Sequence, residues 1–508
     1  MPIASSSRVL AAGVGLAGTP RGRTGGLRAA GLALAILSLL AHAALAETRT
    51  QRQRPRPASS GIATLDAALA RAYATNPDIL AQRAQVRATR ETIPQARAAM
   101  LPQVSATTYA GVLATSSLLR GSPVNVTESS TLPRRGVALT ASQTLFDGGR
   151  TQNAVHQAER LTAAQREQLR AVEHAVLLDV AATFVAVHTG QALVEVQRRN
   201  VGFLRETLAA IRTRLGAGVA TPTDIAQAEA RLSRGLADLN AAEAGLAVAR
   251  DRFLRLVGAM PSPRLAGVRT PERLLPRSGE AARDLAGRDN PAVLAAAEAV
   301  RGADAAVRVA QGQMLPQVTL EGQAARDMDA DSATRRIDSL QVVGRMTVPL
   351  YAGGGPEAQV RQNRELAGQA RLVLDSARLQ ARSAAYSGRV AFDNASFAAK
   401  AASDEVRSAD VTVEGIRKQL DAGLRTITEL LNAQQDAVSA RARLIQAQGD
   451  RTVASYTVLA AIGRLDPPAL GIRTEAAPAP PPQSDLDVRL DAWRGLRDAA
   501  TVPAASRR

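Results

Sequence analysis

The stretch MLPQV at residues 100–104 occurs a second time at residues 314–318. Upstream of it, the dipeptide Asn76-Pro77 recurs as Asn290-Pro291, and both repeats have an offset of 214 residues (314−100 and 290−76). Two motifs repeated in the same order at the same distance indicate one architectural unit that is duplicated within the chain.

Later motifs repeat at a shorter offset. LFDGG at residues 145–149 corresponds to LYAGG at residues 350–354, and Gly218 corresponds to Gly423, both with an offset of 205 (350−145 and 423−218). The offset therefore changes by nine residues (214−205) in the segment between the two sets of motifs. A length change confined to one segment indicates a loop whose size the fold tolerates.

Composition excludes several classes of site. The chain of 508 residues has no cysteine, which rules out disulfides, thiolate metal sites and a lipid anchor on an N-terminal cysteine. Its net charge of +17 falls to about +13 without the four arginines of residues 1–46. Basic chains often bind nucleic acid, but aromatic residues for base stacking make up only 2% here, and acids alternate with the arginines. We therefore expect a mixed, solvated surface and no nucleic-acid partner.

Residues 1–46 have the pattern of a secretory signal peptide. Arginines at 21, 23 and 28 precede an apolar run at residues 29–40, and small residues at 44–46 precede Glu47. That run is too short to span a bilayer, and no later stretch offers about twenty consecutive apolar residues. We expect an exported chain without a transmembrane helix, in which any passage through a membrane requires a β-barrel.

The rest of the chain divides into four segments. Residues 47–60 are predicted to be a flexible leader, residues 61–270 the first repeat of the body, and residues 271–470 the second repeat. Residues 471–508 are rich in proline and arginine and are predicted to be a disordered tail.

Proline is absent from residues 134–221 and 357–466, which permits very long helices. Apolar residues between Val176 and Leu215 recur with a spacing typical of a straight helix or a left-handed coiled coil. This pattern predicts a helix from Arg150 to Leu215, about 100 Å long at 1.5 Å per residue. A returning helix is predicted from Pro222 to about Val257, and its counterpart from Ile427 to about Ile462.

Four segments rich in Val, Thr and Ser alternate between apolar and polar residues, namely residues 103–113, 136–146, 317–326 and 338–351. Each consecutive pair predicts a β-hairpin. Each repeat is therefore expected to contain a helix, two strands, a very long helix, a sharp turn and a returning helix. Four strands cannot close a barrel alone, and open edges aggregate, so we expect oligomers that merge the strands into one barrel.

Three kinds of local motif have structural explanations. The sequences TPTD at residues 221–224 and TITE at residues 426–429 are capping boxes. The glycines Gly218 and Gly423 are expected to end the long helices. The glycine runs that begin at Gly148 and Gly353 lack the spacing and the lysine of a phosphate loop. They predict strand-to-helix turns instead, formed by Asp147, Gly148, Gly149, Gly353 and Gly354.

No pattern indicates an enzyme, a metal or a cofactor. His156, His174 and His188 lie 18 and 14 residues apart on one predicted helix, or about 27 and 21 Å, which is too far for shared metal ligation. The sequence contains no Ser/His/Asp constellation or paired catalytic carboxylates in a supporting context.

Taken together, the motifs NP, LPQ, LFDGGR and G-x-x-T-x-T-D-x-x-Q-A-E, followed by the same order again, resemble the TolC family of outer-membrane efflux and secretion channels. The resemblance covers about residues 60–470. It implies a mainly α fold with a small β part, in which each chain forms one third of a trimeric α-barrel and of a twelve-stranded transmembrane β-barrel. It also implies a periplasmic helical body, contact with outer-membrane lipid, a periplasmic membrane-fusion adaptor, and an inner-membrane ABC transporter or other pump.

In this family the turns between the helices form the periplasmic entrance. By matching position, Thr223 and Asp224 on the first turn would face Arg425 on the second. The acidic positions of the second turn fall on Glu429 and Asn432, so a cation-attracting ring would be weaker here. Leu420 replaces a tyrosine of the best-known members, which removes one hydrogen bond from the closed entrance.

The resemblance predicts an exit channel for type I protein secretion or multidrug efflux. The Thr-Asp-x-x-Gln-Ala-Glu turn and the missing lipidation cysteine favour the secretion type. The alternative is a periplasmic coiled-coil adaptor or structural protein without a membrane barrel. Such a protein needs one helical hairpin flanked by small β-domains, whereas this chain has a duplicated pattern of hairpin and helices.

Overall fold

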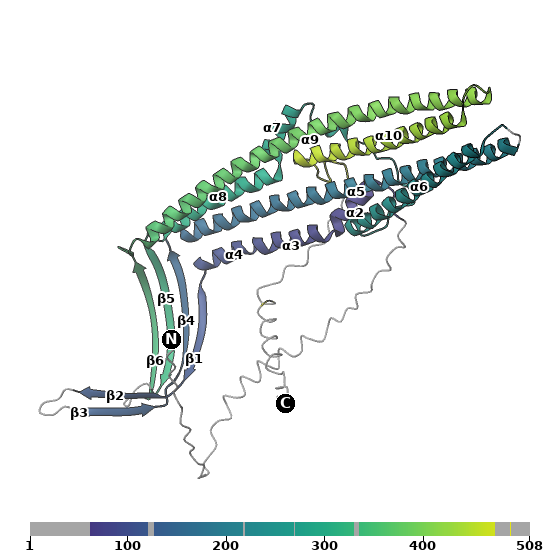
Figure 1. The fold of residues 1–508 in the computed structure, drawn as a ribbon. Coiled ribbons are helices and arrows are strands. Elements are labelled where there is room, and N and C mark those ends of the chain that lie inside the picture. Colours follow the sequence, from purple (N-terminus) through teal and green to yellow (C-terminus); the bar gives the residue numbers. More distant parts are fainter. Residues whose placement is uncertain are drawn as a thin grey trace, which may run out of the picture. The chain divides into compact units, whose positions relative to one another are not determined.

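The computed structural model describes residues 61–119, 126–216, 219–268, 270–329, 335–472 and 488 (Figure 1). The predicted signal peptide and leader lie outside the described residues, as do Gly218 and nearly all of the predicted tail. The described part is mostly helical with some strands, which agrees with the predicted fold class at that level.

The elements of the first half begin with short helices and end with a very long helix and its return. They are α2 (Leu65–Thr75), α3 (Pro77–Arg90), α4 (Thr92–Arg97), η1 (Ala98–Met100), β1 (Gln103–Ala110), β2 (Leu113–Leu119), β3 (Val126–Leu132), β4 (Arg135–Phe146), α5 (Arg150–Gly216) and α6 (Pro222–Val257).

The second half follows a similar order. Its elements are η2 (Glu272–Leu274), α7 (Gly279–Asp289), α8 (Pro291–Gly312), β5 (Gln317–Met328), β6 (Arg336–Thr347), α9 (Gly355–Asp421) and α10 (Ile427–Ala461). The two long helices, α5 and α9, contain 67 residues each. Proline at the first helical position starts α6, and a capping box starts both α6 and α10.

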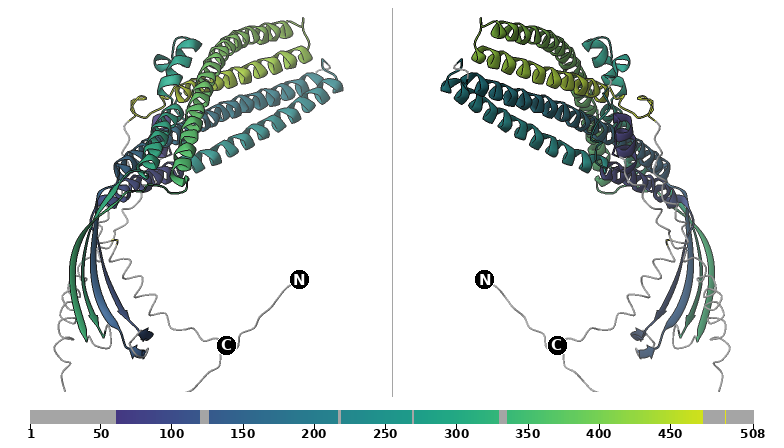
Figure 2. Two further views of the ribbon diagram at one scale, coloured as in Figure 1. Left: turned by 90° about the vertical axis from the view of Figure 1, so that its left-hand side faces the viewer. Right: turned by 90° about the vertical axis from the view of Figure 1, so that its right-hand side faces the viewer.

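Four strands form one antiparallel sheet in the order β1-β4-β5-β6. Both predicted hairpin pairings are present, and the two hairpins join through β4 and β5. The predicted strand at residues 338–351 instead ends at Thr347, shortly before Pro349, which has no N–H to donate to a ladder. The sheet lies at one end of the helices, away from the turns that join the long helices to their returns (Figures 1 and 2).

The segment between β1 and β4 is not the loop predicted from the sequence, and that prediction was wrong. It contains a separate hairpin, in which β2 and β3 pair from Leu113 with Leu132 to Leu119 with Val126. This segment also accounts for the change of offset between the two halves. The apolar residues of β2 lie in pairs at its two ends, and β3 is polar between Val126 and Leu132, so neither strand shows the apolar–polar alternation that distinguishes a strand from a loop.

The helices form two antiparallel pairs, α5 with α6 and α9 with α10, while α8 packs against both long helices (Figure 2). The core lies midway along α5. Phe184 is fully buried with its ring centroid 6.2 Å from that of Phe253 on α6, and Leu177 and Val180 are buried beside it.

Helix α5 also has the length and composition of a membrane span, with a window of mean hydropathy 1.5, although the sequence analysis expected no such segment. In this structure 56% of that window is buried inside the protein. Burial against other helices is typical of a core helix of a large protein, so the apolar character of α5 is explained by its packing.

Each Asn-Pro motif ties the start of one helix to the end of another. The Oδ1 atom of Asn76 accepts a hydrogen bond from the Asp78 N–H, while its amide donates to the carbonyl of Leu256 at 3.2 Å. Asn290 does the same with the Ala292 N–H and the carbonyl of Ala461, at 2.8 Å. An amide both accepts and donates, whereas a carboxylate only accepts. This double role explains why asparagine occupies both positions.

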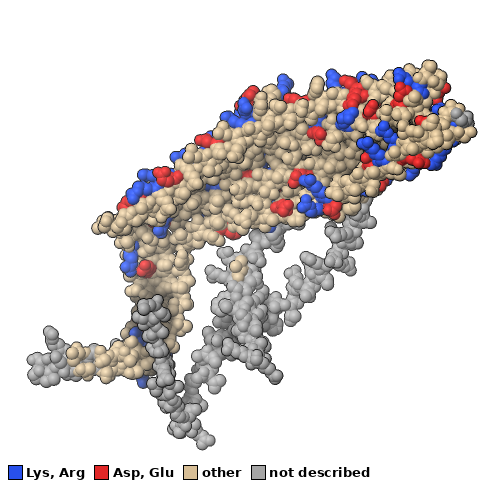
Figure 3. All heavy atoms as spheres, in the orientation of Figure 1, with Lys and Arg blue, Asp and Glu red and all other residues tan. Residues whose placement is uncertain are grey.

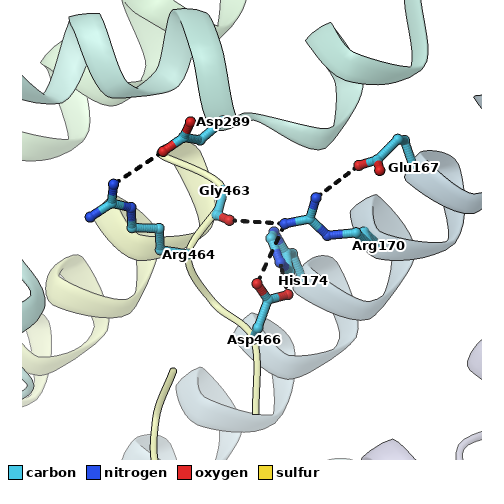
Figure 4. Close-up of polar contacts among 7 residues, drawn as sticks. All are labelled: Glu167, Arg170, His174, Asp289, Gly463, Arg464 and Asp466. Carbon is cyan, nitrogen blue, oxygen red and sulfur yellow. Dashed lines mark hydrogen bonds and ion pairs between the residues drawn. The ribbon is translucent and has the colours of Figure 1, made fainter. Parts of the chain in front are cut away.

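A polar cluster fixes the chain where it leaves α10 (Figure 4). His174 of α5 is 5% exposed, and its Nε2 lies 2.8 Å from Oδ1 of Asp466. Arg170, one turn earlier on α5, contacts the other carboxylate oxygen of Asp466 and the carbonyl of Gly463. Gly463 has φ of +77°, and a Cβ there would lie 2.2 Å from the carbonyl oxygen of Asp289, so only glycine fits this turn.

Stability should depend on pH through Asp466. Burial alone would raise the pKa of this carboxyl, but the hydrogen bond from His174 and the charge of Arg170 hold the pKa below its ordinary value of 3.8. A lowered folded-state pKa means that the charged form stabilises the fold above pH 3.8, and that this contribution is lost as the pH falls through the folded-state value.

We expect Asp466→Asn to lower the free energy of unfolding by about 1 kcal/mol near neutral pH. The difference from wild type should shrink below the ordinary aspartate pKa. Thermal unfolding of both proteins across the acidic range measures this. The control is Asp289→Asn, which removes a more exposed pair with Arg464. A wild-type advantage that persisted unchanged at the lowest pH would contradict the assignment.

Candidate channel surfaces: the sheet and the helix tips

One face of the four-stranded sheet is apolar and exposed. Side chains alternate between the two faces of a strand, so the register of the ladders places alternate residues of all four strands together. Leu340 is 82% exposed, Val342 71% and Val104 66%. The residues of this face, here called the apolar face, include Val104, Ala106, Val137, Leu139, Ala141, Val318, Leu320, Ala324, Leu340, Val342 and Met346.

The opposite face is mainly polar. The hydroxyls of Ser105 and Thr140 lie 2.7 Å apart, and the Gln341 amide donates to the Gln323 side chain at 2.7 Å. Arg345 pairs with Glu321 on the same face at 3.5 Å. In Figure 3, acidic and basic side chains are spread over the helices, while most visible atoms of the sheet belong to other residues. The sheet thus separates an apolar surface from a hydrogen-bonding one.

The predicted strand-to-helix turns lie between this sheet and the long helices. Gly148, Gly149, Gly353 and Gly354 all have positive φ, between 66° and 78°. The buried carboxylate of Asp147 accepts hydrogen bonds from the N–H and the hydroxyl of Thr151 at the start of α5. At the equivalent turn Ala352 replaces Asp147, and α9 begins without a side-chain cap.

At the other end of the helices, both capping boxes are formed. The Asp224 carboxylate accepts a hydrogen bond from the Thr221 N–H at 2.8 Å, and the Glu429 carboxylate accepts one from the Thr426 N–H at 2.8 Å. The hydrogen bonds from the backbone of Thr221 lower the pKa of Asp224. The backbone of Thr426, and then the guanidinium of Arg425, lower the pKa of Glu429. Both acids are therefore held in the charged form.

The remaining predicted tip residues lie on the second turn and beside it. Arg425 donates to Glu429 at 2.7 Å and to Gln419 at 3.1 Å, so its partners among the described residues of this protomer lie on its own turn. Thr223 is exposed, and Gly423 adopts φ of +78° at the end of α9. Gly218 lies outside the described residues, and the structure does not bring Arg425 to Thr223 or Asp224 within one protomer.

Two hydrogen bonds that the sequence analysis missed join the two coiled coils at the tips. The hydroxyl of Thr428 on α10 donates to the Gln227 side chain on α6 at 2.9 Å. One turn further along both helices, Arg231 donates to Asn432 at 2.7 Å. We call these two contacts the tip rungs. Asn432, predicted as a weakened acidic position, is therefore the acceptor of an arginine.

Apolar contacts support the tip rungs. Ile427, the first residue of α10, packs against a cluster of Leu208, Ile211 and Ala228 from the other coiled coil. Leu420 lines a cavity of about 250 Å³ together with Phe203, Ile211 and Leu430. Leu420 thus contributes apolar lining between the coiled coils at the position where the family resemblance pointed to a missing hydroxyl.

Metal ligation has no support in the part of the chain that the structure describes. There, no group of three or more His, Asp or Glu residues lies close enough to hold an ion. His156 is exposed beside Glu159, whereas His174 belongs to the cluster with Asp466. The candidate function therefore rests on the sheet faces and the helix tips.

The chain is similar to known outer-membrane proteins in sequence and in fold. The family model described as "Outer membrane efflux protein" matches residues 68–259 and 283–464. The chain is 32% identical to outer membrane efflux protein BepC of Brucella suis, covering 85% of this chain and 92% of that protein. It is 26% identical to outer membrane protein TolC of Vibrio cholerae, covering 77% and 88%. The crystal structure of the outer membrane protein VceC from Vibrio cholerae is similar in fold, with a TM-score of 0.67 and 17% identity, over 78% of this chain and 96% of that one.

Proposed function

The chain belongs to the outer membrane efflux protein family, and from this membership we propose that three copies form an exit channel for type I protein secretion or multidrug efflux. Proteins of this family reside in the outer membrane, and the predicted location agrees with that. The predicted family is confirmed, as is the predicted function at the level of an efflux or secretion channel. We propose, in addition, that the channel is a trimer with a shared barrel and that it works with partner proteins.

The apolar face is the observation that supports the proposal most strongly. A water-soluble protein rarely leaves so many large apolar side chains exposed in one contiguous patch. From Val318 to Arg326, β5 extends about 27 Å at 3.4 Å per residue, close to the roughly 25 Å apolar band of outer-membrane barrels. This match favours a sheet that faces lipid over the alternative of a periplasmic adaptor without a barrel.

The edges of the sheet support assembly into a trimer. Within the described residues, β1 and β6 each pair with a neighbour on one side only. Unpaired backbone groups in lipid cost several kcal/mol each, so each edge needs a partner strand. Three four-stranded sheets joined edge to edge give a closed barrel of twelve strands, with the polar face lining its interior. We propose that each chain contributes its two structural repeats, residues 61–270 and 271–470, to one third of this barrel and of a helical periplasmic barrel.

The helix tips are proposed to form the periplasmic entrance, built from Thr223, Asp224, Leu420, Arg425, Glu429 and Asn432. The tip rungs would restrain the two coiled coils of one protomer. Arg425 would remain available for contacts with a neighbouring protomer, because its described partners lie on its own turn. A periplasmic adaptor and an inner-membrane pump complete the proposed pathway, and the channel itself carries out no catalysis.

Crosslinking in outer-membrane extracts tests the assembly. We expect a band of three chains, because a single protomer leaves both sheet edges unpaired. The absence of cysteine allows single cysteines to be introduced on the edge strands β1 and β6 without background. Disulfides between chains should form only when both strands carry one. A predominantly monomeric, water-soluble protein would rule out the proposed channel.

A deletion strain distinguishes secretion from efflux. Loss of one exported protein with unchanged tolerance to toxic compounds indicates secretion, and the reverse indicates efflux.

A further inference from the structure

Three arginines stand at the end of the apolar face that lies farthest from the helices. The ladder register places Arg135, Arg326 and Arg336 on the same face as Val342. Their side chains are 67%, 50% and 58% exposed. The apolar face therefore ends in a row of accessible guanidinium groups, where a sheet spanning a membrane would meet the lipid headgroups.

These arginines are only partly neutralised. Within the part of the chain that the structure describes, Arg326 and Arg336 share a single carboxylate, that of Asp338, at 2.6 and 2.5 Å. Among the described residues, the acid that pairs with Arg135 is Asp329, at 3.9 Å. Each guanidinium has five N–H donors, so one shared carboxylate leaves most of the donors of this cluster available to a further anion.

A hollow in the sheet surface leads away from this cluster. Its volume is about 560 Å³, and Ala106, Val137, Leu139 and Ala324 line it, with Arg326 and Asp338 at one end. The short alanine side chains leave a depression between the larger apolar side chains beside them. The hollow thus has an apolar surface that could hold an acyl chain, next to cationic side chains that could hold an anionic headgroup. These are the two parts of an acidic lipid.

We propose that this end of the sheet binds an acidic membrane lipid that bears phosphate and a net negative charge, with its phosphate on Arg326, Arg336 and Arg135 and an acyl chain in the alanine-lined hollow. Arginine suits this role because its planar donors match phosphate oxygens in pairs. The inference rests on the proposed function, since it requires the apolar face to lie in a membrane. It goes further by assigning a specific lipid site to that face.

Native mass spectrometry of delipidated wild-type trimers tests the site. The trimers are titrated with lipid A, a phosphorylated and acylated glycolipid, and in parallel with phosphatidylcholine, whose headgroup carries no net charge. We expect retention of lipid A in preference to phosphatidylcholine. One arginine near a membrane surface contributes about a fivefold change in binding. Arg326→Gln with Arg336→Gln should therefore weaken lipid A binding about 25-fold, and Arg135→Gln alone about fivefold.

The matched control is Arg345→Gln, which removes an arginine from the polar face of the same sheet. Its lipid A binding should equal that of wild type. Equal retention of both lipids by wild type, or equal loss in the control and the double variant, would overturn the lipid site. The same spectra report the trimer mass, so a wild-type protein that never forms trimers would overturn the proposed channel instead. Among the described residues, Arg135→Gln removes only the 3.9 Å contact with Asp329, which keeps the test valid if the double variant fails to assemble.

Discussion

Val342→Arg should remove the assembled protein from the outer membrane, whereas the same replacement at Gln341 should leave it there. Val342 is 71% exposed on the apolar face, in the middle of the five ladder rows between Arg326 and Val318. An arginine on the lipid face near the bilayer midplane costs about 2–4 kcal/mol. Three copies per trimer bring the cost to about 6–12 kcal/mol, which is comparable to the whole stability of many proteins.

Gln341 is the matched control because it is the adjacent residue on the opposite face, hydrogen-bonded to Gln323. In the proposed barrel this face borders water, so a charge there should be tolerated. Membrane fractionation and the fraction of crosslinked trimer measure both variants. If Val342→Arg fractionated and assembled like Gln341→Arg, the apolar face would not contact lipid, and the proposed orientation of the sheet would be wrong.

Breaking both tip rungs should open the periplasmic entrance. In Arg231→Ala with Thr428→Val, the two coiled coils of each protomer lose the two hydrogen bonds that join them at the tips among the described residues. Exposed contacts of this kind contribute about 0.5 kcal/mol each, so six of them in a trimer add about 3 kcal/mol to closure. That is enough to shift an open population about a hundredfold. Single-channel conductance in planar bilayers should therefore rise.

Arg212→Ala provides the control for this experiment. Arg212 also lies near the tip, but its partner Glu229 belongs to the same coiled coil, so its loss does not separate the pairs. Arg425→Ser should also raise conductance if Arg425 binds a neighbouring protomer, and high salt should partly reproduce that effect in wild type. Unchanged conductance in a correctly assembled double variant would show that apolar packing around Ile427 holds the entrance instead.

The sequence predicted what depends on neighbours along the chain. The helix starts at Pro222 and Ile427 follow from capping boxes, and the length of α5 and α9 follows from the absence of proline. The pair of Arg425 with Glu429 also has the spacing of a local helical contact, but the family resemblance pointed to Thr223 and Asp224 as its partners instead. The repeated motifs were sufficient to indicate the family, because their order is preserved twice.

What the sequence did not reveal depends on distant contacts. Gln227 and Thr428 are 201 residues apart, and nothing local to either residue indicates that their helices converge. The role of His174 likewise requires knowing that Asp466 returns to α5 from 292 residues away. The hairpin of β2 and β3 was missed for a different reason, since neither strand alternates regularly between apolar and polar residues.

The joining of β4 to β5 has a consequence for how the chain folds during export. Strand β4 ends at Phe146 and its partner β5 begins at Gln317, so 171 residues (317−146) must follow before the inner strands can pair. Contacts so distant in sequence form slowly. Exposed apolar strands that have not yet paired tend to aggregate. A chain that emerges with its N-terminus first therefore presents the β1–β4 hairpin to the periplasm long before it has a partner. The yield of functional channel should consequently be set by how well periplasmic chaperones shield that hairpin during the delay.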